Sequence, residues 1–567
     1  MKKTYIVLLG ILLTAGLNLN IKAQLSGTKT IPGDYSSIAN AATALNANGV
    51  GAGGVVFDIA AGHTETVSNL VISITTNLPT AANPVVFQKS GTGANPLITA
   101  AAGASPTIDG IIKLNGTDYT TFDGIDLLDP TSNTGDARME WGFVFLRVST
   151  SNGCQNNVIR NCNITLQKEN TASIGIFISK LNLAGSIITA NSSSGRNSYN
   201  KVYGNNITNV DNGITVNAEA FSSLGRDEGN EIGMNGFGAN NITNWGDDGD
   251  QVVEAIKCQN QLDLKINNNV IAGGNDSTIP TSVINISTSA SSGQSNLEVS
   301  YNQISINSLG DVSCIIGGGA AYDSVRIHNN IVENCNVSGS FTAIGVIPAS
   351  NGRAFVHNNT IRNNTFTLPY NNYLIGAFGA FHGGNLSIHS NQIYGNQNIS
   401  ADGRIYCIYI ESGAVECYSN TVFNNSIPNS SGTLASSIYG YLNGGATPSQ
   451  KIYNNTFSNL SIGGSNTAAN TKITGIVVNG QPSTLTEIYG NLVSGLSGPC
   501  GSGTSGGVRG IYVSFSSNIH NNKIYDLTNT STTGITIGCQ IEYGTQAIYN
   551  NFISSLYAPI QTTITVL

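Results

Sequence analysis

We predict an all-β fold, a single-stranded right-handed parallel β-helix, from three features of this 567-residue sequence. Glycine is abundant, at 66 residues, and only 10% of the residues are charged, against roughly 25% in an average soluble protein. One short motif recurs thirteen times in the chain. Short β-like runs fill the gaps between copies and are separated by Gly, Asn and Ser. A chain of this length exceeds one ordinary hydrophobic core, so a repeat architecture is expected.

The charge balance excludes two classes of partner. The chain carries 24 basic and 32 acidic residues, a net charge of −8. Binding to nucleic acid or to an anionic membrane surface requires clustered Lys and Arg, so we expect neither. The 40% content of hydrophobic residues also excludes wholesale disorder.

Residues 1–23 have the pattern of a secretory signal peptide. Lys2 and Lys3 form a charged start, an apolar run covers 6–13, and Ala23 provides a small residue before the cut. The apolar run is shorter than the ~20 residues that a membrane span needs. We therefore expect a secreted or outer-surface protein with no membrane span once the signal is removed.

Residues 24–52 are predicted to cap the start of the solenoid. Within them, Ser36–Asn48 has helical spacing, with Ser36 as N-cap and Gly49 just past the end. Its apolar positions are Ile38, Ala41, Ala42 and Leu45. Early strands are expected at Val55–Ile59, Pro84–Phe87 and Gly110–Leu114, and a surface loop from Asp129 to Trp141.

The solenoid itself is predicted over 53–567, with about 13 recognisable repeats from 158 to 553. The repeated motif is apolar-x-x-Asn-x-apolar, and its first copy has Cys162 in place of Asn. Successive copies are separated by 28 to 43 residues. The recurring Asn residues are Asn205, Asn240, Asn269, Asn302, Asn330, Asn359, Asn391, Asn420, Asn455, Asn491, Asn522 and Asn551.

Two or three short strands per repeat, with no helix between them, describe one coil of a parallel β-helix. Coils stack at the strand spacing of ~4.8 Å, so the recurring Asn can form an amide ladder that satisfies buried polar groups at a turn. The flanking apolar residues, Phe237 beside Asn240 among them, should point into the core. A β-propeller needs blades of ~40–50 residues, and leucine-rich repeats need a helical half that is missing here.

The nine cysteines are too few for a disulfide scaffold, and their odd number leaves at least one unpaired. Cys162 and Cys417 are expected as small buried apolar side chains. A bond between Cys407 and Cys417 across a turn is the alternative that the sequence leaves open.

Segments 34–38 and 55–65, together with the Ile-Tyr/His-x-Asn-x-Ile copies, resemble secreted right-handed parallel β-helix proteins with the pectin-lyase-like fold. This fold hosts lyases, hydrolases, esterases, adhesins and spacers, so the resemblance implies architecture more than activity. The chain is also similar to N-terminal regions of bacterial surface proteins exported by type IX secretion. Those proteins usually add a C-terminal sorting domain, which is missing here. We therefore expect either a continuation beyond Leu567 or a partner covering the last coil.

The best acidic cluster is Asp247, Asp248 and Asp250, after Trp245. Asp247 and Asp248 resemble the paired Asp of polygalacturonases, but that family's Asn-Thr-Asp and Gly-His-Gly motifs are missing at the corresponding coils. Glycosidases need two positioned carboxylates, so this pair is the candidate for catalysis. The same three residues could bind calcium or form a plain turn. Apart from possible calcium, we expect no cofactor.

An aromatic residue follows the first apolar position in nine copies of the motif, where strand alternation directs it outward. We expect an external aromatic stripe that stabilises coil register, with a sugar-binding platform or a metal site on the three consecutive His as alternatives. Mutual repulsion should disfavour protonation of these His. The nine residues are Tyr203, His328, His357, His389, Tyr418, Tyr453, Tyr489, His520 and Tyr549.

These observations favour a structural or adhesive surface module without catalysis. Such a module would present its loops and aromatic stripe to an extracellular glycan or a cell-surface protein. The alternative is a polysaccharide-degrading enzyme, either a lyase or a glycoside hydrolase.

Overall fold

The computed structural model describes residues 23–559 with several gaps. The gaps are 105–106, 221–223, 247–251, 274–280, 288–294, 319–321, 348–351, 380–383, 481–485 and 504–505, and positions 432, 446, 467 and 502. The predicted signal peptide falls almost entirely outside the described residues. Over the described residues, no helix is long and apolar enough to cross a membrane.

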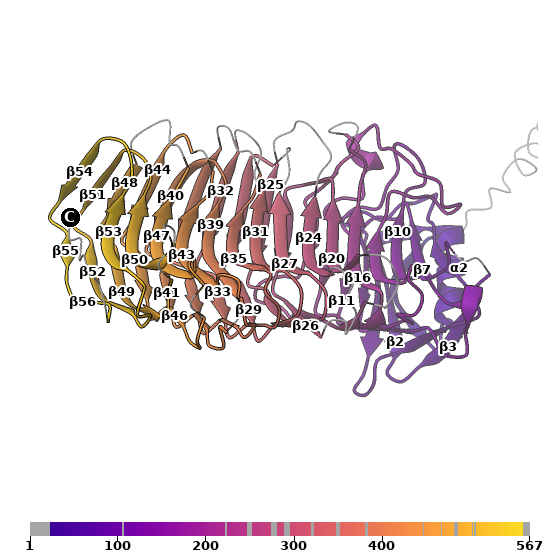
Figure 1. Cartoon of the computed structure of the whole chain (residues 1–567). Helices are drawn as coiled ribbons and strands as arrows, with labels where there is room; N and C mark the ends of the chain where they lie inside the picture. Colours follow the sequence, from indigo (N-terminus) through magenta and orange to yellow (C-terminus); the bar gives the residue numbers. More distant parts are fainter. Residues whose placement is uncertain are drawn as a thin grey trace, which may run out of the picture.

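The chain winds into a rod-shaped parallel β-solenoid (Figure 1). Three parallel sheets run along the rod, and each coil contributes strands to all three in turn. Sheet A has 17 strands, sheet C has 15, and sheet B is built from 22 shorter segments, beginning with β3 (Thr64–Val67). The predicted fold class is therefore confirmed.

Sheet C forms one long face of the rod. Its neighbouring strands pair in register, so one outward column of side chains can be followed from coil to coil. In order, its strands are β4 (Leu70–Ile72), β7 (Gly110–Asn115), β10 (Trp141–Leu146), β13 (Ile174–Ile178), β16 (Asn212–Asn217), β20 (Val253–Gln259), β24 (Thr281–Ser287), β27 (Val312–Gly318), β31 (Phe341–Ile347), β35 (Asn371–Ala377), β39 (Arg404–Ile410), β43 (Ser437–Asn443), β47 (Lys472–Val478), β50 (Gly507–Val513) and β53 (Thr536–Ile541).

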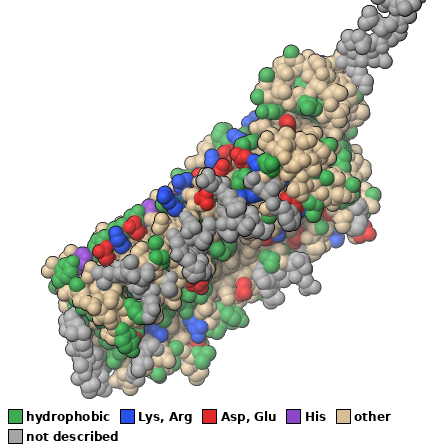
Figure 2. Space-filling model, turned by 90° about the horizontal axis from the view of Figure 1, so that it is seen from above, with side chains coloured by type: hydrophobic (Ala, Val, Ile, Leu, Met, Phe, Trp, Pro, Cys, Tyr) green, Lys and Arg blue, Asp and Glu red, His purple; other side chains and the backbone are tan. Residues whose placement is uncertain are grey.

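Sheet A begins with β1 (Leu25–Ile31), β2 (Val50–Ala60) and β5 (Val85–Ser90). Acidic and basic side chains alternate along its outward face, which Figure 2 shows as a row of red and blue with histidine beside it. Its later strands are β25 (Asn296–Ser300), β28 (Ser324–His328), β32 (Arg353–His357), β36 (Asn385–His389), β40 (Ala414–Tyr418), β44 (Gln450–Tyr453), β48 (Thr486–Tyr489), β51 (Ser517–His520) and β54 (Gln546–Tyr549).

Helix α2 (Ile38–Asn48) covers the first coil, as its apolar spacing predicted. The four apolar residues named above are all buried against the core. The N-cap is Ser37, whose hydroxyl accepts from the backbone N–H of Asn40 at 3.1 Å, so the prediction of Ser36 is wrong by one residue. Ser36 instead accepts from the Asn40 side-chain amide. The Glu65 carboxylate also accepts from the first two helical N–H groups and ties the cap to the coil beneath.

The predicted strands near 55–59, 84–87 and 110–114 are present as β2, β5 and β7. The predicted loop from Asp129 to Trp141 is only partly correct. Trp141 begins β10, and Asp129 and Met139 are buried, so this segment packs against the solenoid.

The Asn ladder is confirmed over all twelve predicted residues. From Asn240 to Asn551, each side-chain oxygen accepts from the side-chain amide of the ladder Asn one coil earlier, at 2.8–3.0 Å. The amide nitrogen of each ladder Asn also donates to a backbone carbonyl of the preceding coil. Asn391, for example, donates to the Val356 carbonyl at 2.8 Å. Eleven of the twelve are buried, and Asn551 in the last coil is partly exposed. Cys162 joins the ladder through its backbone N–H, which donates to Asn205.

A left-handed residue precedes most ladder positions and turns the chain from sheet A into sheet B. Asn329 and Asn358 have φ of 55°, and Gly490 has φ of 66°. Asn and Gly tolerate this region better than other residues, which explains the many Asn-Asn pairs in the motif.

The chain also contains two shorter amide ladders that we did not predict. One runs five residues after the main ladder through Cys335, Asn364, Asn396 and Asn425. The other lies at an earlier turn and runs through Asn157, Asn200, Asn230 and Gln261. Each satisfies buried turn groups in the same way as the main ladder.

Two further expectations from the sequence are wrong. Phe237 does not point into the core, because Ile232 occupies that place in register with Val202 and leaves Phe237 55% exposed. Cys407 and Cys417 do not pair, since all nine cysteines are free and buried. Burial raises the pKa of Cys162 to about 12, as expected of a small apolar side chain.

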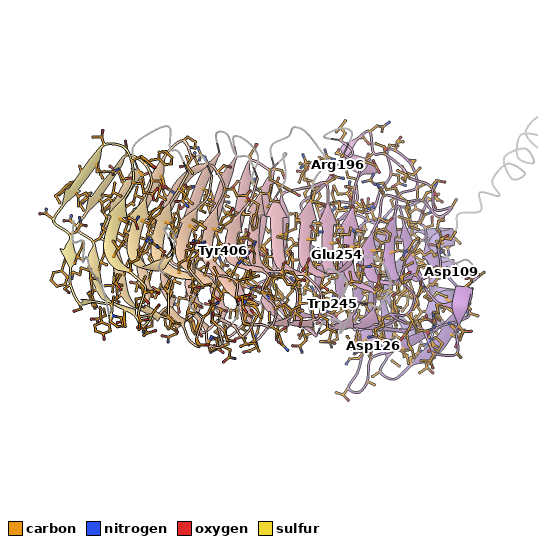
Figure 3. The ribbon with its side chains drawn as sticks, viewed as in Figure 1. Asp109, Asp126, Arg196, Trp245, Glu254 and Tyr406 are labelled. Carbon is orange, nitrogen blue, oxygen red and sulfur yellow. The ribbon has the colours of Figure 1, made fainter. Side chains whose placement is uncertain are left out.

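A buried ion pair links loops of the early coils. It lies near Arg196, which is labelled in Figure 3. Arg147 and Asp227 have fully buried side chains, and their nearest charged atoms are 2.5 Å apart. The backbone N–H of Asn197 donates to the same Asp227 oxygen at 2.8 Å. Arg196 pairs with Glu228 beside them. A charge pair in such a position is costly to break from one side only.

Candidate functional site

The acidic cluster predicted from the sequence lies outside the described residues. Asp247, Asp248 and Asp250 all fall in the gap 247–251, so catalysis and calcium binding there remain predictions. Within the described part of the chain, no three His, Cys, Asp or Glu side chains are grouped to hold a metal ion.

Eight of the nine predicted aromatic residues form one continuous stack on sheet A. Ring centroids from His328 to Tyr549 are 4.7–5.1 Å apart, with interplanar angles of 11° or less. The strand spacing sets this distance, so each ring covers the face of its neighbours. The stack therefore exposes ring edges to solvent while its ring faces are occupied. This arrangement favours a role in coil register, and sugar binding by the stripe remains a prediction.

Tyr203 does not belong to this stack. It is only 7% exposed, packs against Phe237 with centroids 5.3 Å apart, and accepts a hydrogen bond from Arg160. The expectation that it joins the stripe is wrong because Asn267 and Ser300, which precede His328 in the register column, carry no ring.

The three consecutive histidines have pKa values below the ordinary range. Burial is the main cause that lowers the pKa of His357 to about 4, and the positive charges of His328, His389 and Arg326 contribute to the same shift. Burial likewise lowers the pKa of His328 and of His389. Only the central ring, His357, has its neighbouring histidines among the causes of its lowered pKa, so the expected repulsion is seen for that ring.

A cleft on the outward face of sheet C has a different composition. One register column carries three tyrosines, Tyr373, Tyr406 and Tyr439, whose rings stack with centroids 4.9 and 5.3 Å apart. The same column continues through Thr474 to Arg509. A flanking column carries Arg404, Ser437 and Lys472. Thr474 in β47 and Arg509 in β50 thus take the place of the tyrosines where the cleft opens, with Lys472 beside them in the flanking column.

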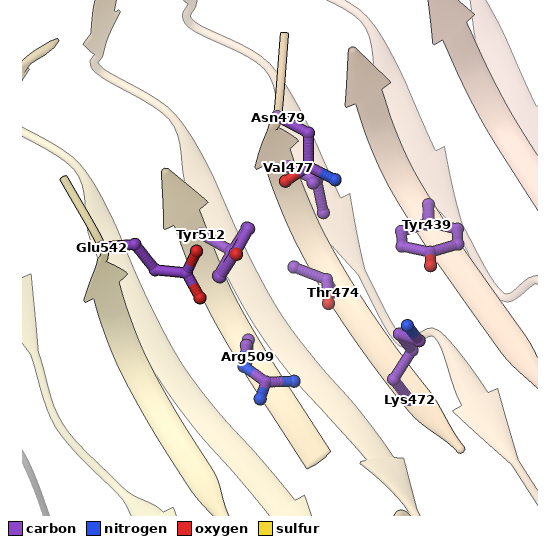
Figure 4. A pocket seen from close by; sticks show the side chains of 8 residues that line it. All are labelled: Tyr439, Lys472, Thr474, Val477, Asn479, Arg509, Tyr512 and Glu542. Carbon is purple, nitrogen blue, oxygen red and sulfur yellow. The ribbon is translucent and has the colours of Figure 1, made fainter. Parts of the chain in front are cut away.

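The cleft has a volume of about 160 Å³ and is open to solvent. Figure 4 shows Lys472 and Tyr439 at one side, Glu542 at the other, and Arg509 between them. The Lys472 ammonium lies 6.0 Å from the centre of the Tyr439 ring, and Arg509 donates to Gln540 at 2.6 Å. This volume is below the ~300 Å³ of typical small-molecule sites, so the cleft is too small to enclose a drug-sized ligand.

Burial is the main cause of the pKa shifts of the residues that line this cleft. It lowers the pKa of Lys472, and the positive charges of Arg509 and Arg404 lower it further. Burial also lowers the pKa of Arg509, and it raises the pKa of Tyr439 to about 12. Two cationic groups, Lys472 and Arg509, therefore line the cleft with one exposed acid, Glu542, and Arg404 adds its charge from outside the lining. Such a site gains stability from an anion that enters it.

Comparison with known proteins gives few matches. No family model and no curated protein matches the chain. Nine chains of solved structures do. An alginate lyase from Paenibacillus sp. str. FPU-7 is 15% identical, over 62% of this chain and 92% of that one, with a TM-score of 0.30. The PL6 family alginate lyase AlyGC is 9% identical, over 93% of this chain and 100% of that one, with a TM-score of 0.21. Structural similarity at this level does not assign the activity of those proteins to this chain.

Sequence reasoning missed the cleft entirely. Its basic residues, Lys472 and Arg509, lie on different coils, and neither stands in a motif. A signal was nevertheless present: the tyrosines two residues into β35, β39 and β43 recur at coil spacing, and aligning the coils on the Asn motif would have placed Lys472 and Arg509 beside them.

Proposed function

We propose that this protein binds an acidic, uronate-bearing polysaccharide in the sheet C cleft, as a secreted or surface-displayed rod. The observation that carries the proposal is the clustering of Arg404, Lys472 and Arg509 beside a tyrosine column in a chain with net charge −8. Guanidinium groups bind carboxylates with matched geometry, and tyrosine rings offer an apolar surface with a polar tip. An open cleft along a rigid rod suits successive sugars of a polymer.

The experiment is calorimetric titration with oligoguluronate and oligogalacturonate hexasaccharides, with maltohexaose as neutral control. Lys472→Ala should weaken binding of the acidic sugar about tenfold, which corresponds to ~1.4 kcal/mol. Lys265→Ala is the matched control, because Lys265 is an exposed lysine on sheet A that makes only a surface ion pair. Absence of acidic-sugar binding, or equal affinity in Lys472→Ala, would contradict the proposal.

A second candidate is β-elimination of the same polymer, and the lowered pKa of Lys472 favours it. A lysine that loses its proton more readily can act as the base that abstracts the proton beside the uronate carboxylate. Arg509 would neutralise that carboxylate. Tyr439, whose pKa is raised to about 12, stays protonated and could donate to the leaving oxygen.

Lys472→Arg separates the two candidates. Arginine keeps the positive charge and is never deprotonated in proteins, so it preserves binding and removes the base. Lyase activity would appear as ultraviolet absorbance of the unsaturated uronate product in the wild type and disappear in Lys472→Arg. A wild type that binds acidic sugar without releasing product is a binding module only.

A further inference from the structure

A second groove, on sheet A, lies beside the aromatic stack and has a volume of about 470 Å³. It is lined by polar and charged side chains from β32, β36, β40 and β44, with Phe355 at one side and Glu416 at the other. Its size falls within the ~300–1,000 Å³ range of ligand pockets in proteins.

The groove exists because one register column has a small residue, Ser387, between larger side chains. The column runs Arg326, Phe355, Ser387, Glu416 and Lys451. Arg326 covers one face of Phe355, with its guanidinium 5.8 Å from the ring centre. On the other face the next strand offers only Ser387, and the flanking position Ala414 is small too.

Because Ser387 is small, it leaves a space about as thick as one aromatic ring beside Phe355. Two strand steps separate Phe355 from Glu416, about 10 Å in all. In the neighbouring column the same two steps hold His357, His389 and Tyr418, with centroids 4.8 and 4.7 Å apart. A flat ring above Ser387 would therefore lie at stacking distance from Phe355 and would still reach the Glu416 carboxylate.

We infer that this groove binds the pyranose ring of a neutral glycan. One face of a pyranose is a patch of C–H groups that can rest on Phe355, and its rim of hydroxyls needs hydrogen-bond partners. The groove supplies these partners in Glu416, Asn385 and Arg353. The Glu416 carboxylate is half-exposed and lies 3.9 Å from the Lys451 ammonium, which leaves it able to accept from a sugar hydroxyl as well. This site is separate from the sheet C cleft and does not depend on it.

The test is calorimetric titration of the full-length protein with cellohexaose, xylohexaose and chitohexaose. At least one should bind the wild type. Ser387→Tyr fills the space above Phe355 with a ring, as in the neighbouring stack, and should weaken binding at least about tenfold. Phe355→Ala removes the stacking face and should have a similar effect. Phe423→Ala is the matched control, because Phe423 is an aromatic residue stacked on Tyr394 in sheet B, and binding should be unchanged.

The outcomes separate this site from the cleft and from a peptide site. Neutral-sugar binding should survive Lys472→Ala, whereas acidic-sugar binding should survive Ser387→Tyr. Binding of none of the three hexasaccharides, or wild-type affinity in Ser387→Tyr with an unchanged melting temperature, would overturn the inference. So would binding of N-acetyl-tyrosinamide in their place, since that marks a groove for an aromatic side chain.

Discussion

The imidazole rings of His357 and His389 lie parallel, with centroids 4.8 Å apart and an interplanar angle of 1°. His328 stacks on the other face of His357 at the same distance, with an angle of 3°. Arg326 adds a further positive charge to this environment, and Glu298 lies 3.5 Å from His328. Protonating the central ring would therefore place a positive charge among like charges with only one acid nearby.

We predict that the protein loses stability as the pH falls from about 6.5 to about 4. The pKa of His357 is lowered from 6.5 to about 4 in the folded chain, so the unfolded chain binds more protons between these values. The stabilising contribution is fully present above pH 6.5 and is lost toward pH 4. Because the ring edge is solvated, we expect a change of roughly 1–2 kcal/mol, measurable as a falling thermal midpoint.

His357→Tyr should flatten this pH dependence without disrupting the stack. Tyrosine already occupies the equivalent place at Tyr418, between rings 4.7 and 4.9 Å away. An unchanged pH profile in the variant would assign the effect to other groups.

Removing one ladder amide should destabilise the rod. The Asn391 side chain accepts from the backbone N–H and the amide of Asn359 and donates to Val356 and Asn420. Asn391→Ala removes four hydrogen bonds to buried partners, and we expect a loss of about 2–4 kcal/mol in denaturant unfolding. The matched control is Asn241→Ala, whose amide bonds to Asn206 on the exposed face and whose loss should cost less than about 0.5 kcal/mol. Equal effects in the two variants would refute a special role for the buried ladder.

The pKa of Lys472 should depend on its cationic neighbours. Burial lowers this pKa from 10.5, with Arg509 and Arg404 adding to the effect. Arg404→Gln removes one positive charge, so the pKa should rise toward 10.5 while remaining below it. Amine labelling as a function of pH, followed by mass spectrometry of the Lys472 peptide, measures this midpoint. Labelling of Lys265, on another sheet, should be the same in both proteins.

Breaking the buried ion pair from one side should be more damaging than replacing both partners. Arg147→Met leaves the Asp227 carboxylate buried and unpaired, for an expected loss of about 3–5 kcal/mol. The double variant Arg147→Met with Asp227→Leu should recover most of that loss. Lys265→Met breaks only a surface pair with Glu231, 3.3 Å apart, and should cost less than about 1 kcal/mol. Failure of the double variant to recover would show that the pair itself stabilises the loops.

The features that define one coil of this fold lie within short sequence segments, so they could be recognised from the sequence. The motif around each ladder Asn combines a left-handed turn residue, an amide that needs partners and two apolar neighbours. Any chain that repeats it once per coil must stack in register. The capping helix was predictable because its buried residues follow helical spacing over one segment, 38–45. The N-cap differed by one residue because Ser36 and Ser37 are both competent caps and backbone geometry decides between them.

Which residues of neighbouring coils face each other could not be predicted in the same way, because the coils differ in length. The coil containing Phe237 has extra residues between its core isoleucine and its ladder Asn, and the motif alone cannot show which apolar residue turns inward. Tyr203 is separated from the stack for a different reason, because Asn267 and Ser300, which precede His328 in the register column, carry no ring.

The sequence by itself determined an all-β parallel solenoid, its Asn ladder, its helical cap and the aromatic stripe, because each depends on contacts that repeat at one spacing along the chain. Only the tertiary structure brought Arg404, Lys472 and Arg509 to one cleft and left the space beside Phe355. Both depend on which residues of successive coils share a column. That is fixed by the length of every turn between them, and because successive motif copies are separated by 28 to 43 residues, no single spacing in the sequence shows which residues share a column.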